Sequence, residues 1–194
     1  MTGRIAVIQG HPDPGGDHYG HALALAYAGA AVEAGHEVRQ IEVARLDFPL
    51  LRTYEDFHHG SVPKSLREAQ DAIGRADHLV LFYPLWLGTM PALMKGFLEQ
   101  VLRPGFAFDA GEEGRMPKGR LAGKSARIVV TMGMPAFVYR LFFRAHGLKT
   151  LERSILGLCG VSPVRHTLIG MVEESAARRE KWLAKMRELG AKGK

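Results

Sequence analysis

The 194-residue sequence has little cysteine and no long apolar run. Its one cysteine, Cys159, has no partner for an intramolecular disulfide, and its setting in "SILGLCGVSP" predicts a small core residue. No apolar run approaches the roughly 20 residues that a membrane-spanning helix needs. The first residues show neither the basic segment nor the cleavage site of a secretory signal. We therefore expect a cytoplasmic protein without a membrane span.

Two common phosphate-binding motifs are also missing. The first apolar run is not followed by GxGxxG, the dinucleotide fingerprint, and the P-loop pattern GxxxxGK[ST] does not occur. The turn after that run contains no Ser or Thr, so it differs from the hydroxyl-rich phosphate loop of small electron-carrier flavodoxins. These absences disfavour dehydrogenases of the NAD-binding type, P-loop nucleotidases and electron carriers.

The net charge of +6 does not come from a cluster of basic residues. Lysines and arginines are scattered, and their densest group, residues 176–194, is typical of the solvated face of a terminal helix. Nucleic-acid binding would favour basic residues grouped with exposed aromatics. We expect no nucleic-acid partner, and an anionic small ligand fits the charge equally well.

Short apolar runs alternate five times with longer helical patterns. The pattern predicts strands at residues 4–10, 36–43, 78–86, 125–133 and 162–170. It predicts helices at residues 21–35, 63–77, 90–102, 138–160 (with a break near Gly147) and 175–190. We expect one α/β domain over residues 1–194: a flavodoxin-like three-layer sandwich around a five-stranded parallel sheet of order 2-1-3-4-5. The stretches 44–62 and 103–124 show no regular pattern.

Ligands of such a sheet bind beyond the carboxyl ends of the strands, where the winding reverses. Three segments should meet there, namely residues 9–21, 83–91 and 131–139. The first begins "QGHPDPGGDHYGH". A helix that starts near His18 or Tyr19 directs free backbone N–H groups and the positive end of its dipole at this turn. The turn therefore predicts an anion site, in particular a phosphate site.

The glycines and histidines of this turn suit a phosphate. Gly15, Gly16 and Gly20 let the backbone approach an anion closely, and His11 and His18 can donate ring N–H groups to it. His11 could instead bond a loop carbonyl, and we expect a third histidine, His21, on the helix surface. We expect no metal site, because converging ligands cannot be placed.

The second segment, "FYPLWLGTMPALMKG", suits a flat ring with polar edges. Pro84 lacks an N–H and should end the strand ladder, which frees the N–H groups from Leu85 to Gly88. Trp86 and Leu87 would then line a heterocycle, or alternatively plug the core over the sheet.

The third segment ends a strand in a small turn at Thr131, Gly133 and Met134. Two polar residues follow, Tyr139 and His146. Near a reducible ring, their side chains could stabilise developing negative charge. The alternative is a packed tyrosine and a surface histidine.

Together these stretches resemble the NAD(P)H:quinone oxidoreductase family of flavodoxin-like flavoproteins. "HPDPGGDHYGHALA" is similar to the family's flavin-phosphate turn, and "PLWLGTMPALMKGFLEQVLRPGFAF" is similar to the loop along the isoalloxazine and the helix after it. "TMGMPAFVY" and "AHG" resemble the segment over the polar edge of the flavin and the histidine that follows. The resemblance covers most of the chain.

The resemblance implies a flavin cofactor (FMN, with FAD possible), NAD(P)H as co-substrate, a quinone acceptor and a homodimer whose sites are completed by the partner chain. It implies phosphate contacts from His11, His18 and Tyr19, and a ring lined by Pro84, Leu85, Trp86 and Leu87. It implies bonds to the edge of the ring from Thr131, Gly133 and Met134, and catalytic roles for Tyr139 and His146.

The chain departs from the family at four places. His18 and an insertion with Gly15-Gly16 replace the usual hydroxyl of the phosphate turn, which leaves FMN and FAD open. Leu87 stands where an aromatic is common, Met134-Pro135 replaces a glycine pair, and His146 aligns only after a shift of one residue.

Our hypothesis from the sequence is a flavin-dependent NAD(P)H oxidoreductase that passes two electrons to a quinone or similar acceptor by a ping-pong mechanism. The alternative is a flavin- or nucleotide-binding regulatory or accessory protein with little turnover. Residues 90–102 and the aromatic stretch 103–119 are expected to contact a second copy of the chain; the alternative is a surface loop folded on its own chain.

Overall fold

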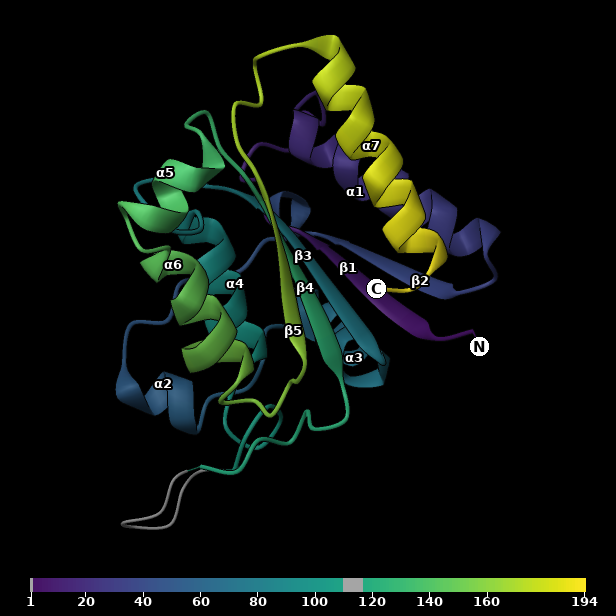
Figure 1. The fold of residues 1–194 in the computed structure, drawn as a ribbon. Helices are drawn as coiled ribbons and strands as arrows, with labels where there is room; N and C mark the ends of the chain where they lie inside the picture. The colour runs from purple at the N-terminus through teal and green to yellow at the C-terminus, as the bar shows by residue number, and fades with distance from the viewer. Residues whose placement is uncertain (1, 110–116) are drawn as a thin grey trace.

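A computed structural model describes residues 2–109 and 117–194 (Figure 1). The strands are β1 (Arg4–Gln9), β2 (Glu37–Glu42), β3 (His78–Pro84), β4 (Ser125–Thr131) and β5 (Val164–Ile169). The α-helices are α1 (Tyr19–Glu33), α2 (Tyr54–His58), α3 (Arg67–Arg75), α4 (Ala92–Val101), α5 (Ala136–Leu141), α6 (His146–Lys149) and α7 (Ala176–Ala191). Short 3-10 turns cover Val43–Arg45 and Lys64–Leu66, and a π-helical segment, Thr150–Leu156, continues α6.

The five strands form one parallel sheet of order β2-β1-β3-β4-β5, which confirms the predicted topology. Along one row of this sheet, Val7 of β1 lies opposite Gln40 of β2 on one side and Val80 of β3 on the other. The row continues to Arg127 of β4 and Arg165 of β5. Because the order reverses between β1 and β3, the carboxyl ends of these strands, with β4 beside them, frame the switch point of the fold.

Helices cover both faces of the sheet because the side chains of the inner strands alternate between two cores. Ile5 and Val7 of β1 pack with α1 and α7 in one core, whereas Ala6 and Ile8 face the other core with α3 and α4. Figure 1 shows α1 and α7 side by side on one face, and α4 and α6 on the opposite face. Cys159 is buried in this second core, as predicted, and burial raises its pKa to about 11.

The break predicted near Gly147 in the helical pattern 138–160 is confirmed: it falls at residues 142–145, since Arg144 and Ala145 adopt left-handed backbone angles. The structure corrects two other expectations. The stretch 44–62 contains the short helix α2. In the part of the chain that is described, no helix is long and apolar enough to cross a membrane.

The second correction concerns the predicted dimer contact at residues 90–119. The apolar side chains of α4 that were expected to face a partner, among them Phe97, are buried in the chain's own core. Phe108 is also buried, and Phe106 packs against Gly74 of α3. The alternative, a segment folded on its own chain, is therefore what the structure has, except that residues 110–116 lie outside the described residues.

Candidate functional site

The turn after β1 is held together by its own polar groups. The Gly10 N–H donates to the Phe82 carbonyl of β3 over 2.7 Å. One carboxylate oxygen of Asp13 accepts from the Gly15 N–H at 2.8 Å, and the other lies 2.7 Å from Nε2 of His18. These contacts close the turn over the start of α1. The bond to His18 also lowers the pKa of the Asp13 carboxyl.

Three histidine rings gather at this turn. The rings of His11 and His18 are stacked with their centres 3.9 Å apart, and the ring of His21 lies 5.3 Å from the first and 5.9 Å from the second. His21 is only 8% exposed and is not a surface residue of α1, so that expectation was wrong. Its burial comes from neighbours outside α1, which the helical pattern does not reveal.

Burial and mutual repulsion keep two of these rings poor proton acceptors. Burial is the largest cause that lowers the pKa of His11, followed by the charges that His18 and His21 carry when protonated. Burial and then His18 lower the pKa of His21. An anion among the rings would act in the opposite direction. The three rings are not arranged as a metal site, since no group of His, Cys, Asp and Glu within residues 2–109 and 117–194 has that geometry.

Backbone donors complete the turn. The N–H groups of Tyr19 and Gly20, at the start of α1, make no hydrogen bond to any described residue. The hydroxyl of Tyr19 points elsewhere: it donates to the Arg179 carbonyl of α7 over 2.8 Å, and burial raises its pKa to about 12. Tyr19 can therefore contribute its N–H group, not its phenol, to an anion at this turn.

The segment after β3 forms a tight exposed turn. Trp86 and Thr89 exchange two backbone hydrogen bonds of 2.9 and 3.0 Å, and the residues between them, Leu87 and Gly88, have φ angles of 47° and 84°. Leu87 is fully exposed and Trp86 half exposed, so the core-plug alternative is wrong. A leucine with positive φ is strained, and such strain concentrates at functional sites.

Two of the four N–H groups expected to be free after Pro84 are in fact bonded. Leu85 donates to the Thr131 carbonyl of β4 over 2.8 Å, which extends the strand ladder by one bond, and Trp86 donates to Thr89. Among the described residues, only the N–H groups of Leu87 and Gly88 in this turn are left without an acceptor. The donors available to a ligand therefore lie at the tip of the turn.

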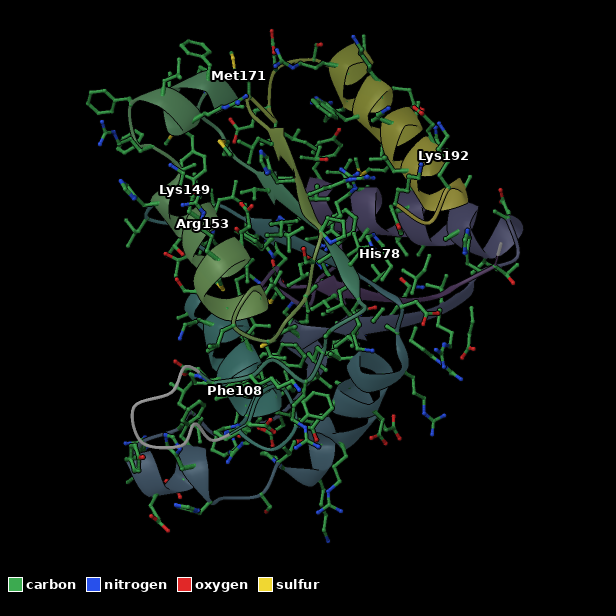
Figure 2. The ribbon with its side chains drawn as sticks, turned by 60° about the horizontal axis from the view of Figure 1, so that its bottom comes forward. His78, Phe108, Lys149, Arg153, Met171 and Lys192 are labelled. Atoms are coloured by element: carbon green, nitrogen blue, oxygen red, sulfur yellow. The ribbon has the colours of Figure 1, made fainter. Side chains whose placement is uncertain are left out.

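The three segments meet at one edge of the sheet. The Trp86 ring lies edge-on to His11, with the centres 6.2 Å apart, which joins the first two segments. In the third, Thr131 is buried at the end of β4, and Gly133 and Met134 are exposed. The Met134 carbonyl accepts from the N–H of Met171, which follows β5 (Figure 2).

Tyr139 connects the second and third segments. Its hydroxyl donates to the Gly88 carbonyl at 3.3 Å and accepts from the Leu148 N–H at 3.1 Å. The side chain is buried, and burial raises its pKa, so the phenol keeps its proton. His146 is exposed at the start of α6, and the next residue, Gly147, touches the Gly88 turn. The structure thus bonds Tyr139 to this turn, whereas His146 only precedes the glycine that touches it; a packed tyrosine and a surface histidine are what the burial of the two residues shows.

The sheet order and the site at its switch point define a doubly wound α/β protein with flavodoxin topology. The chain belongs to the flavodoxin-like fold family (Flavodoxin_2), whose model matches residues 3–189.

Named relatives agree with this assignment. Over 156 residues the chain is 28% identical to an uncharacterized NAD(P)H oxidoreductase of Haemophilus influenzae, an alignment that covers 78% of this chain and 76% of that protein. It is 29% identical over 139 residues to an FMN-dependent NADH:quinone oxidoreductase of Pseudomonas aeruginosa, which covers 69% of this chain and 61% of that one. A crystal structure from Streptococcus mutans superposes with a TM-score of 0.81 at 27% identity, over 97% of this chain and 98% of that chain.

Proposed function

We propose that this chain is a flavin-dependent oxidoreductase that catalyses two-electron transfer from NAD(P)H to a quinone or similar acceptor in a ping-pong sequence. The observation that carries the proposal is the meeting of three strand ends: the histidine turn after β1, the Trp86–Thr89 turn after β3 and the segment after β4. The likeness to the Pseudomonas FMN-dependent NADH:quinone oxidoreductase supports it, as does the assignment of the uncharacterized Haemophilus relative to the NAD(P)H oxidoreductases. The Pseudomonas relative supports FMN as the cofactor, with FAD as the alternative.

The residues at this edge fit a flavin. His11, His18 and the N–H groups of Tyr19 and Gly20 offer donors to its phosphate, and buried polar nitrogens beside them lack a partner within the described chain. Pro84, Leu85, Trp86 and Leu87 would line the ring, with the free N–H groups of Leu87 and Gly88 beside its polar atoms. Thr131, Gly133 and Met134 would bond its edge. A bound flavin supplies the hydride chemistry, and the protein supplies position and charge.

Tyr139 and His146 would act at the reacting edge. The Tyr139 phenol stays protonated and fixes the Gly88 carbonyl, and it would thereby hold in place the turn that lines the ring. His146 is exposed at the start of α6 and would be open to a bound substrate. His146 would stabilise negative charge as a hydride moves, which is the usual contribution of a placed donor. Tyr139, whose proton is donated to the Gly88 carbonyl, would act by positioning the turn. The exposed faces of Trp86 and Leu87 would receive the nicotinamide and then the acceptor at the same place.

The proposal includes a homodimer in the cytoplasm, where NAD(P)H is available. Four exposed apolar side chains follow the site, and we name them the α5 patch: Phe137, Leu141, Phe142 and Phe143. Monomers rarely leave so many neighbouring apolar side chains in water. A second copy seated on this patch would lie on the helix that holds Tyr139, the residue bonded to the Gly88 turn, and we propose that the partner chain completes each site there.

The visible spectrum of the purified protein tests the function first. We expect flavin absorbance, or its appearance after addition of FMN, and release of the flavin by acid identifies FMN or FAD. A protein that stays colourless with both flavins contradicts the proposal. With flavin bound, NADH and benzoquinone should give turnover at saturating quinone; a flavin-loaded protein without turnover supports a regulatory or accessory role instead.

A further inference from the structure

Two buried nitrogens beside the phosphate turn have no hydrogen-bond partner among the described residues. They are Nε2 of Gln9, a residue 5% exposed, and Nδ1 of His21, a residue 8% exposed. Leaving a buried polar atom unpaired costs about 1–3 kcal/mol, so such atoms mark places that a ligand or water completes. Nε2 of Gln9 faces the first turn of α1, because it lies 3.9 Å from the position of a Cβ built on Gly20.

The side chains of Gln9 and His11 can both donate a hydrogen bond at this point. The Oε1 of Gln9 already accepts from the His11 N–H at 2.9 Å, so its amide nitrogen is the end left for a ligand. Nδ1 of His11 accepts from the Asp13 N–H at 3.1 Å, which leaves the proton of the neutral ring on Nε2. Of the two carboxylates in this turn that could repel an anion, Asp13 is paired with His18, and Asp17 is exposed to solvent.

We propose that Gln9 and His21 are further ligands of the phosphate site, and that the histidine cluster selects a phosphomonoester dianion and takes up a proton when it binds. The inference rests on the proposed function, because the phosphate concerned is that of the flavin. FMN carries such a dianion, FAD carries a diester instead, and riboflavin carries no phosphate.

The charged groups around the rings decide which histidine takes the proton. His11 is bonded through Nδ1 to the Asp13 N–H, and His18 is paired with Asp13. His21 faces His18 and Asp13 from the turn, and Glu42 and Arg45 from the end of β2. Glu42 and Arg45 pair with each other, and the neighbour from the β3 side, Trp86, is uncharged. His21, with its free Nδ1, is therefore the ring that gains a proton when a dianion arrives.

The affinity for FMN should depend on pH. Burial lowers the pKa of His21 in the free protein, and a nearby dianion raises it. FMN affinity should therefore fall as the pH rises from 6.5 to 8, by up to about tenfold per pH unit. Below about pH 6 the phosphate itself becomes a monoanion, and the affinity should fall again. The affinity for riboflavin should show neither slope.

The experiment is a fluorescence titration of flavin-free protein with riboflavin, FMN and FAD at pH 6.5, 7.2 and 8.0. Calorimetry of FMN binding in two buffers of different ionisation enthalpy then counts the protons taken up. We expect FMN to bind more tightly than FAD, with uptake approaching one proton near neutral pH. His21→Gln keeps a polar group but cannot titrate, so it should abolish the uptake and the pH slope, weaken FMN by about tenfold and leave riboflavin unchanged.

Two further variants serve as a control and as a second test of the phosphate site. His59→Gln, which alters a histidine at the end of α2, is the matched control and should behave as wild type. Gln9→Glu keeps the acceptor for the His11 N–H but places a carboxylate against the phosphate, so it should weaken FMN without affecting riboflavin. Riboflavin binding also reports whether either site variant is folded.

The outcomes separate this inference from the proposed function. Three results would overturn the inference and leave the proposed flavoenzyme in place. They are an FMN affinity that is independent of pH, as that of riboflavin should be, a wild-type pH slope in His21→Gln, and FAD binding as tight as FMN binding. Failure of all three flavins to bind overturns both.

Discussion

At the scale of single residues, His78 shows how the fold sets the charge of a side chain. It lies at the amino end of β3, far from the site, and is 7% exposed (Figure 2). Its Nδ1 lies 2.8 Å from the Ser125 hydroxyl, whereas its Nε2 has no partner in the described chain. Burial, and then the positive charge of Arg127, lower its pKa to about 4. The folded protein therefore holds this ring neutral.

Acid should destabilise the fold through His78. Its folded pKa of about 4 lies below the unfolded value of 6.5, so its contribution is complete above pH 6.5 and is lost as the pH falls toward 4. The loss is on the order of 3 kcal/mol. Urea unfolding between pH 7 and 4 measures it, and His78→Asn, which keeps a polar group near Ser125, should flatten the profile. An equally steep profile in His78→Asn would assign the acid sensitivity to another group.

At the scale of elements, the site depends on how closely α6 approaches the turn after β3. A Cβ on Gly147 would collide with the Gly88 carbonyl and lie 2.7 Å from Cα of Thr89. The same carbonyl accepts the Tyr139 hydroxyl. Gly147, Gly88 and Tyr139 thus form one contact between two segments that are far apart in the sequence.

Gly147→Ala should displace the Trp86–Thr89 turn and destabilise the fold by about 1–3 kcal/mol, because a backbone carbonyl cannot yield as a flexible side chain does. Thermal unfolding should show a Tm lower by several degrees, with a changed flavin spectrum in the loaded protein. The matched control is Gly29→Ala in α1, where a Cβ meets nothing within 4 Å and helix propensity favours alanine. A Gly147→Ala protein as stable as Gly29→Ala would contradict the tight contact.

Much of the element pattern could be predicted because it depends on local periodicity. The five strands, their order and the start of α1 near Tyr19 follow from apolar runs and from the polar turn. His21 could not be predicted, since α1 is rich in alanine and apolar residues and shows no polar face; the rings of His11 and His18 bury it from outside the helix. The bonded N–H groups of Leu85 and Trp86 likewise depend on partners that only the folded chain supplies. The roles of the predicted site residues stay predictions.

At the scale of the whole molecule, the α5 patch is the surface whose exposure most needs an explanation. Its four side chains are 47–79% exposed, and the rings of Phe142 and Phe143 contact each other edge to face. Arg140 stands between Phe137 and Leu141 in the sequence, Arg144 follows Phe143, and both arginines are exposed. The patch adjoins Tyr139 in the sequence, so a partner that covers the patch would also lie close to a residue of the site.

Replacing Leu141 and Phe142 together by serine should convert a dimer to a monomer, because both side chains would leave water on association. Sedimentation velocity over a hundredfold range of concentration measures this. Leu25→Ser, which alters another exposed leucine on the outer side of α1, is the control and should leave the dimer intact. A wild-type chain that sediments as a monomer throughout rejects the dimer, and an unaffected dimer in the double variant places its interface elsewhere.

The hydrogen bond from Tyr19 to Arg179 links the first turn of α1 to α7, so α1 contributes both to the site and to the packing of the helices. Its first turn presents the donors of the phosphate site, and the rest of its length packs against α7. Anything bound at that first turn therefore also braces a pair of helices that covers one whole face of the sheet. Because a ligand that binds only the native state lowers the population of open forms, we expect the lifetime of this chain against proteases to follow the supply of flavin in the cell.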